Sequence, residues 1–254
     1  VSRRVDSTEM RVIAALRYRP FRRVIAISEA IAAVLRDRGV EDDRLVVIRS
    51  AVDAGRFAEA PDRAAFRREF NIPAGTFVIG AAGQLIPRKG HRFLLQAIAD
   101  LGHGGRPIRL LIFGEGYLAN QLRAQAASLR LFDVVQFVGF REDLDDYMGC
   151  FDLFVHPALS EGLGVATLKA QAAGVAVVGF AAGGLNEAVA HGQTGLLVPP
   201  EDIDALENAI RTLVADDDLR SRMGCAGRQR MQKDFAMVTM AARHVDIYES
   251  ILNG

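Results

Sequence analysis

Short apolar runs alternate with segments of helical periodicity along most of the chain. Six runs of strand length are predicted between residues 76 and 198, and two shorter runs precede them. The predicted strands are Val24–Ile27, Leu45–Ile48, Thr76–Ala82, Ile108–Phe113, Val134–Val138, Asp152–His156, Val175–Gly179 and Leu196–Val198. Most of these runs are almost continuously apolar, which is typical of a parallel sheet that is buried on both faces.

The segments between the strands have the spacing of helices that cover such a sheet. In the predicted helix 89–101, the apolar residues share one face: Phe93, Leu94, Ala97, Ile98 and Leu101. Further helices are predicted after Ser28, at 115–129, at 142–148, directly after Glu161, at 202–214 and through the last forty residues. This alternation predicts an α/β fold, a Rossmann-like doubly wound parallel sheet of about six strands.

Glycine-rich or polar loops follow the carboxyl ends of five predicted strands. They are Gly83–Gly90, Gly114–Gly116, Phe140–Arg141, Glu161–Gly164 and Gly183–Glu187. Ligands of doubly wound sheets bind beyond the carboxyl ends of the strands. Five such loops at one edge of one sheet therefore predict a binding site there.

The loop around Glu161 is the most informative of the five. It places one acid beside two glycines, Gly162 and Gly164, immediately before an apolar helix. Glycines let the backbone approach a ligand, and the positive end of a helix favours an anion. A carboxylate can accept hydrogen bonds from sugar hydroxyls, although Glu161 could instead cap its helix. The loop predicts a nucleotide-sugar or sugar-phosphate pocket, with backbone N–H groups of residues 162–165 facing phosphate.

A second loop, Pro87–Gly90, is basic and lies at a predicted helix start. Cations there oppose the helix dipole unless an anion binds. We therefore expect Lys89 and Arg88 to bind a diphosphate, with ordinary surface charge as the alternative.

Charge and composition narrow the class of protein. The chain has 31 lysine and arginine residues and 31 aspartate and glutamate residues, so its net charge is zero. No nucleic-acid partner is therefore expected. The two cysteines are too few for a disulfide framework, which favours a reducing cytoplasm. The histidines lack metal-ligand spacing, so we expect no metal and no cofactor. His156 is interpreted as a core histidine, and Asp145 and Asp146 as solvated.

Residues 1–23 are basic, with seven arginines and two acidic residues. One interpretation is a solvated helical face. The other is peripheral contact with the anionic inner face of a membrane, or with a phosphate-bearing acceptor.

Taken in order, several segments resemble a known family. They are Val24–Ala30, Gly83–Gly90, Phe137–Phe140, Ser160–Gly164, Gly183–Glu187 and Gly195–Pro199. Together they are similar to the C-terminal half of retaining GT-B-fold glycosyltransferases of family 4, the glycosyl transferases group 1. The resemblance implies three parts: 1–50, a remnant of the N-terminal acceptor domain and a partial second Rossmann-like domain; 51–235, the donor-binding domain; and 236–254, a helix that crosses back.

The resemblance also implies an activity and assigns residues to it. The enzyme would move a sugar from a nucleotide-diphospho-sugar to an acceptor hydroxyl with retention and without a metal. Lys89 and Glu161 would be catalytic, with Lys89 on the leaving diphosphate and Glu161 on the donor sugar. The donor would further contact Gly83, Gln84, Arg88, Gly114, Phe140, Arg141, Gly162, Leu163, Gly164, Val165 and Lys169, and the backbone near Phe140 would meet the base.

Two positions depart from the family pattern. Gln84 stands where the family usually has an arginine that helps hold the diphosphate, and Lys169 stands where it has a ribose-binding glutamate. Lys169 cannot accept hydrogen bonds from a ribose diol, but it could bind phosphate. The donor is then held differently, or activity is weakened.

The expected acceptor is a carbohydrate or a glycolipid, in the synthesis of polysaccharide, lipopolysaccharide or glycolipid. Because most of the acceptor domain would be absent, we expect this chain mainly to bind the donor and to have little transferase activity alone. Its unpaired apolar surface makes a homodimer an option. The alternatives are a non-catalytic nucleotide-sugar-binding module and another GT-B enzyme, such as a nucleotide-sugar epimerase.

Overall fold

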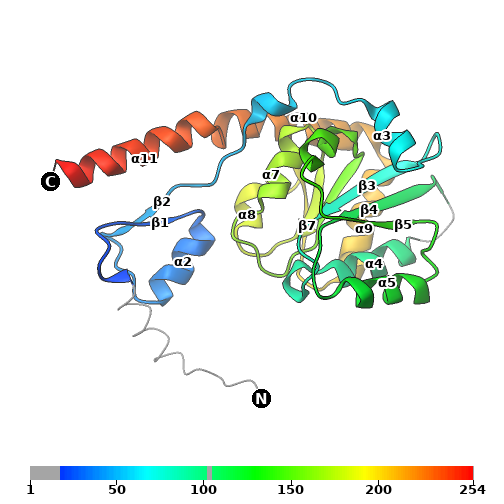
Figure 1. The fold of residues 1–254 in the computed structure, drawn as a ribbon, viewed down its shortest axis with the longest axis horizontal. Coiled ribbons are helices and arrows are strands. Elements are labelled where there is room, and N and C mark those ends of the chain that lie inside the picture. Colours follow the sequence, from blue (N-terminus) through cyan, green and yellow to red (C-terminus); the bar gives the residue numbers. More distant parts are fainter. Residues whose placement is uncertain (1–17, 102–104, 254) are drawn as a thin grey trace, which may run out of the picture.

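The computed structural model describes residues 18–101 and 105–253. A six-stranded sheet forms its larger part, and a small two-stranded unit lies at one end (Figure 1). All six strands are parallel, in the order β5-β4-β3-β6-β7-β8. They are β3 (Phe77–Ala82), β4 (Ile108–Phe113), β5 (Val135–Gly139), β6 (Leu153–His156), β7 (Val177–Phe180) and β8 (Gly195–Val198). The predicted doubly wound sheet is confirmed.

Helices cover both faces of this sheet because side chains alternate along each strand. On one face, Ile79 and Leu110 pack against α4 (His91–Asp100), α5 (Ala119–Ser128) and α9 (Ile203–Ala215). On the other face, Val78 and Leu111 pack against α3 (Arg63–Glu69), α7 (Val165–Ala172) and α10 (Asp217–Asp234). All six residues of β3 are buried, so the middle of the sheet is inaccessible to water.

The strand order creates a crevice at the carboxyl edge. From β3 the chain runs outward through β4 to β5, and then returns to place β6 on the other side of β3. The loops after β3 and β6 therefore leave in opposite directions, which opens the sheet edge to a ligand between them.

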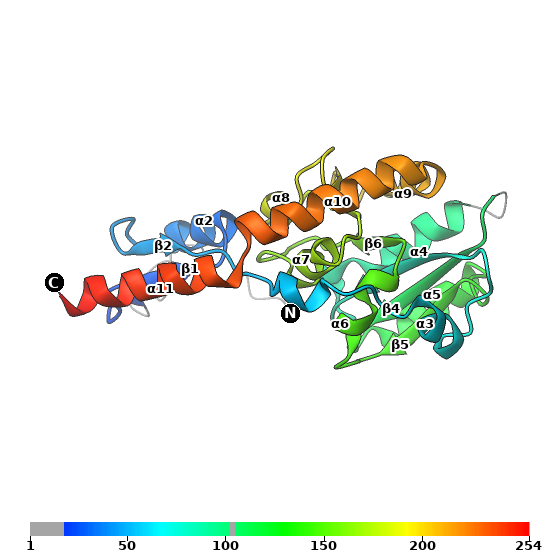
Figure 2. The same cartoon turned by 90° about the horizontal axis from the view of Figure 1, so that it is seen from above.

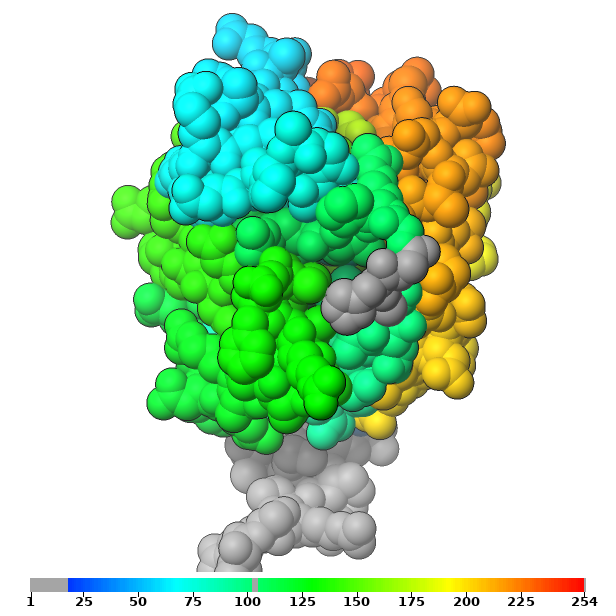
Figure 3. Space-filling view, turned by 90° about the vertical axis from the view of Figure 1, so that its right-hand side faces the viewer, coloured from blue at the N-terminus to red at the C-terminus, as the bar shows by residue number. Residues whose placement is uncertain are grey.

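Other segments of the chain cover the opposite edge of the sheet, where the strands begin. Arg106, just before β4, pairs with Asp217 at the start of α10, with 3.0 Å between Nη1 and Oδ1. Figure 3 faces this end, and the cyan segment that carries α3 lies beside the orange helix α10 on its surface. The crevice lies at the other ends of the strands.

Some predicted helix limits are wrong. The helix predicted from Glu115 begins only at Ala119, because the backbone of Gly116 and Leu118 lies against Leu85, whose carbonyl accepts from the Leu118 N–H at 3.0 Å.

Helix α3 was not predicted; Asp62 caps it by accepting from the Ala65 N–H at 2.8 Å. The remaining short elements are η1 (Ala54–Phe57), η2 (Pro87–Lys89), α6 (Leu144–Tyr147), η3 (Met148–Cys150) and α8 (Leu185–Ala188).

The small unit is a parallel βαβ arrangement of β1 (Val24–Ala26), α2 (Glu29–Asp37) and β2 (Leu45–Val47) with its own apolar cluster. Helix α11 (Met237–Leu252) runs beside it in both ribbon views (Figures 1 and 2). Arg22 donates to the Ile251 carbonyl at 2.8 Å.

The division of the chain into three parts at residues 50 and 235 stays a prediction. Most of the basic segment 1–23, namely residues 1–17, lies outside the described residues.

Candidate functional site

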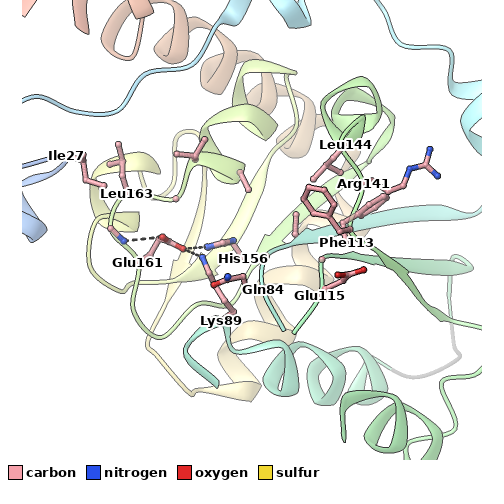
Figure 4. Close-up of a pocket in the computed structure, with 18 residues that line it drawn as sticks. Ile27, Gln84, Lys89, Phe113, Glu115, Arg141, Leu144, His156, Glu161 and Leu163 are labelled. Carbon is pink, nitrogen blue, oxygen red and sulfur yellow. Dashed lines mark hydrogen bonds and ion pairs between the residues drawn. The ribbon is translucent and has the colours of Figure 1, made fainter. Parts of the chain in front are cut away.

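A cavity of about 580 Å³ opens at the carboxyl edge, lined by the loops after β3, β4, β5 and β6 (Figure 4). All but two of the site residues predicted from the sequence line it. Those present are Gly83, Gln84, Lys89, Gly114, Phe140, Arg141, Glu161, Gly162, Leu163, Gly164 and Val165. Folding thus brings together residues that lie up to 82 positions apart, because the parallel strands all end at one edge.

Glu161 is the centre of a polar cluster in this cavity. Its Oε2 pairs with the Lys89 ammonium and lies 2.8 Å from Nε2 of His156, while Oε1 accepts from the Gly162 N–H at 3.1 Å. The side chains of Lys89 and Glu161 are 13% and 12% exposed. The carboxylate is therefore held in one orientation from three directions, yet it still faces the cavity.

The protonation states in this cluster follow from burial and charge. Burial opposes ionisation of Glu161, but hydrogen bonds from His156 and Lys89 outweigh it and lower its pKa to about 2. Burial, with the nearby Lys89 charge, lowers the pKa of His156. At neutral pH a neutral His156 therefore donates its Nε2 proton to an ionised Glu161.

The start of α7 provides an anion-binding geometry. Gly164 is its N-cap, with a φ of 88°, and no side chain caps the helix. Residues 162–166 all line the cavity, so the positive end of the helix dipole lies at its wall. Gly114 has a φ of 129°, and a Cβ atom there would lie 2.1 Å from the Gly83 carbonyl oxygen. Only glycine therefore allows the loops after β3 and β4 to approach so closely.

The two predicted site residues outside the cavity lining are Arg88 and Lys169. Arg88 reaches Gln84, with 3.5 Å between Nη2 and Oε1. Lys169 pairs with Asp145 on α6, at 2.8 and 3.0 Å from its two oxygens. Asp145 also lies 3.5 Å from Arg56 and is only 13% exposed. The interpretation of Asp145 as solvated is thus wrong, whereas Asp146, 65% exposed, is solvated.

The β5 end of the cavity carries an exposed aromatic ring and a restrained arginine. Phe140 is 67% exposed. Arg141 donates to Asp143 at 2.6 and 2.7 Å and to the Tyr147 hydroxyl at 2.7 Å, and it pairs with Glu69 at 2.8 Å. In Figure 4 its guanidinium points away from the Lys89 end. The Arg141 guanidinium is therefore largely paired with groups of the protein itself.

Sequence reasoning assigned no role in the site to several lining residues: Ile27, Phe113, Leu144, His156 and Glu115, the last of which lies in the predicted loop Gly114–Gly116. His156 is buried, as its interpretation as a core histidine states, but it also lines the cavity and bonds to Glu161. Its place at the end of β6, directly before the Glu161 loop, was the signal for this role. Ile27 carried no such signal, because it comes from the small unit.

The small unit contacts the Glu161 loop. Ser28 caps α2 and donates its hydroxyl proton to the Gly162 carbonyl, with 2.6 Å between the oxygens. Glu187 accepts from the Ala30 N–H at 3.0 Å and pairs with Arg49 at 2.9 Å. These contacts fix one wall of the cavity relative to the small unit.

Two kinds of feature are absent from residues 18–101 and 105–253. No group of three or more histidine, cysteine, aspartate or glutamate side chains there has the arrangement of a metal site. No helix in this part of the chain combines the length and apolarity needed to span a bilayer.

Comparisons with known proteins agree with this geometry. Residues 62–230 match the family described as glycosyl transferases group 1. The chain is 33% identical, over 79% of its length and 55% of the relative's, to a GDP-mannose-dependent monoacylated alpha-(1-6)-phosphatidylinositol monomannoside mannosyltransferase of Corynebacterium glutamicum. It is 31% identical to the D-inositol 3-phosphate glycosyltransferase of Streptomyces avermitilis, over 96% of this chain and 54% of that one.

The fold is likewise similar to solved structures. Anabaena HepE, crystallised with UDP and glucose, superimposes with a TM-score of 0.89 and 27% identity over 96% of this chain and 68% of that one. This chain spans about half the length of the two curated relatives. Because the family match covers more than half of the chain, the chain belongs to the glycosyl transferases group 1 family.

Proposed function

We propose that this chain binds a nucleotide-diphospho-sugar and takes part in transfer of its sugar, with retention, to an acceptor hydroxyl. The observation that carries the proposal is the meeting of Lys89 and Glu161 beside the start of α7 at the switch point of the sheet. A cation and a helix N-terminus suit a diphosphate, and an oriented carboxylate suits sugar hydroxyls.

In this proposal, Lys89 and α7 stabilise the charge that develops on the leaving diphosphate. The diphosphate competes with Glu161 for the Lys89 ammonium, so Oε2 of Glu161 becomes able to accept from a sugar hydroxyl. His156 keeps the carboxylate in place during this exchange, because its own contact with Oε2 does not depend on Lys89. No step requires a metal.

The acceptor and the place of reaction are inferred from the relatives. The phosphatidylinositol monomannoside in the name of the Corynebacterium enzyme supports a glycolipid acceptor. We propose that transfer to it takes place at the inner face of a membrane. The same name specifies GDP-mannose, whereas HepE was crystallised with UDP. These two proteins therefore differ in the nucleotide base.

One observation supports a second function, a non-catalytic nucleotide-sugar-binding module. Gln84 is uncharged and Lys169 is paired with Asp145, so Lys89 and Arg141 are the only cationic lysine or arginine side chains of the described cavity lining. Hydrolysis or transfer of a bound donor by a protein that also carries an acceptor domain separates an enzyme from a binding module.

The test is thermal unfolding with UDP, GDP, ADP, dTDP and CDP, with and without EDTA. A nucleotide at ~100 times its Kd adds about 2.7 kcal/mol to the stability. We expect one nucleotide to raise Tm equally in both buffers, and Lys89→Met to reduce the shift strongly. Lys233→Met, which alters an exposed lysine on α10, is the matched control. The absence of any shift in the wild-type chain contradicts the proposal.

A further inference from the structure

The strand order arranges the lining side chains along the cavity. The loops after β6, β3, β4 and β5 carry Glu161, Lys89, Glu115 and Phe140 in that order. Three inter-strand steps span roughly 14 Å, about the distance from the sugar to the base of an extended nucleotide sugar. In Figure 4, Glu115 and Arg141 lie at the opposite end from Lys89 and Glu161. A base bound with its diphosphate at Lys89 therefore lies near Glu115.

Glu115 is an exposed acid at this end. A Cβ atom placed on Gly139, the last residue of β5, would lie 4.0 Å from its Oε1, so the carboxylate lies beside the strand end that leads to Phe140. The two cationic lysine or arginine side chains of the described lining pair with other acids: Lys89 with Glu161, and Arg141 with Glu69 and Asp143. The Glu115 carboxylate remains an acceptor for a ligand.

The common bases differ in what they offer to a carboxylate. An ionised carboxylate has two acceptor oxygens and no donor. Guanine presents N1–H and N2–H donors side by side, which match both oxygens. Uracil and thymine present one N–H between two carbonyl oxygens, which a carboxylate repels. Adenine and cytosine present one amino group beside a ring-nitrogen acceptor. Guanine is therefore the base that pairs with both oxygens of Glu115.

We propose that Glu115 selects guanine and that the donor is a GDP-sugar. This inference rests on the proposed function, which supplies the nucleotide site itself. Phe140, 67% exposed, offers a ring on which any base can stack, so it contributes affinity without choosing the base. Arg141 is turned toward Asp143 and Tyr147, so its guanidinium is not placed to compensate the carbonyl oxygens of uracil.

The test compares GDP, IDP and UDP binding to the 254-residue chain by titration calorimetry. IDP differs from GDP only by the missing N2 amino group. We expect GDP to bind roughly tenfold more tightly than IDP, because one charge-assisted hydrogen bond is lost. Glu115→Ala should weaken GDP binding roughly 10- to 100-fold and remove the difference between GDP and IDP. Glu115→Gln, which keeps one acceptor oxygen, should lie between them.

Glu142→Ala is the matched control, because it removes one exposed acid from the adjacent loop, outside the cavity lining. It should leave all three affinities unchanged, and unchanged Tm values show that the variants fold. Tightest binding of UDP, or unaltered GDP binding by Glu115→Ala, overturns the inference while leaving the proposed function intact. If no nucleotide binds, the proposed function itself fails, and this inference with it.

Discussion

Lys89 and Glu161 form an ion pair although 72 positions separate them in the chain. Lys89 comes from the loop after β3 and Glu161 from the loop after β6, and these strands are neighbours in the sheet. The pair joins the side chain proposed to bind the diphosphate to the one proposed to bind the sugar. The proposed binding of a diphosphate at this site therefore exchanges one salt bridge of Lys89 for another.

The ionised state of Glu161 stabilises the fold, and the effect depends on pH. Its folded pKa of about 2 is below its ordinary value of 4.5, so this stabilisation is complete above pH 4.5 and is lost as pH falls toward 2. Glu161→Gln should therefore lower the free energy of unfolding by about 3 kcal/mol at pH 7. Urea unfolding should show this difference shrinking between pH 4.5 and 2. A constant difference across that range contradicts the prediction.

His156 acts as a positioning residue for Glu161. His156→Asn removes the 2.8 Å contact with Oε2, so Glu161 loses its orientation while Lys89 remains able to bind phosphate. A nucleotide sugar should bind more tightly than its nucleoside diphosphate, and the variant should reduce this ratio of affinities roughly tenfold. The affinity for the nucleoside diphosphate itself should hardly change. Calorimetry on both ligands measures this split. His244→Asn, on α11, is the control, and an equal loss for both ligands would show that the site has simply collapsed.

Lys169 should contribute little to donor binding, in contrast to Lys89. Its ammonium is held by Asp145 on α6, outside the cavity lining. Lys169→Met should change nucleotide affinity by less than about twofold and stability by no more than about 1 kcal/mol, whereas Lys89→Met should weaken binding roughly 10- to 100-fold. Both variants lose one positive charge, so long-range electrostatics is matched. Equal losses would instead support the phosphate contact expected from the sequence for Lys169.

Gly114 should be intolerant of any side chain. A Cβ atom there meets the Gly83 carbonyl oxygen at 2.1 Å, at a φ of 129°. Gly114→Ala should destabilise the protein by about 2–4 kcal/mol and weaken nucleotide binding, because the two loops must separate. Gly105→Ala meets nothing within 4 Å and should change stability by less than about 0.5 kcal/mol. Thermal unfolding of the two variants makes the comparison, and equal Tm values would refute the role of Gly114.

Local patterns predicted most of the fold. The six long strands were predicted within two residues of their observed limits, because buried parallel strands are apolar runs that differ from their surroundings. The Gly83–Gly90 and Glu161–Gly164 loops were identified as site loops because strand ends and glycines are visible in the sequence. The start of α5 at Ala119 was missed, since the turn before it is set by contact with the distant Leu85.

The sequence by itself determined the fold class, and it was enough to propose the binding edge of the sheet and the residues Lys89 and Glu161, because periodicity, glycines and charges are local properties. The tertiary structure alone decided how these residues pair. It placed His156 on Glu161, turned Lys169 toward Asp145 and brought Ile27 of the small unit to the cavity. Such contacts depend on strand order and helix packing, which bring distant segments together, and no local pattern records which distant partner a side chain meets.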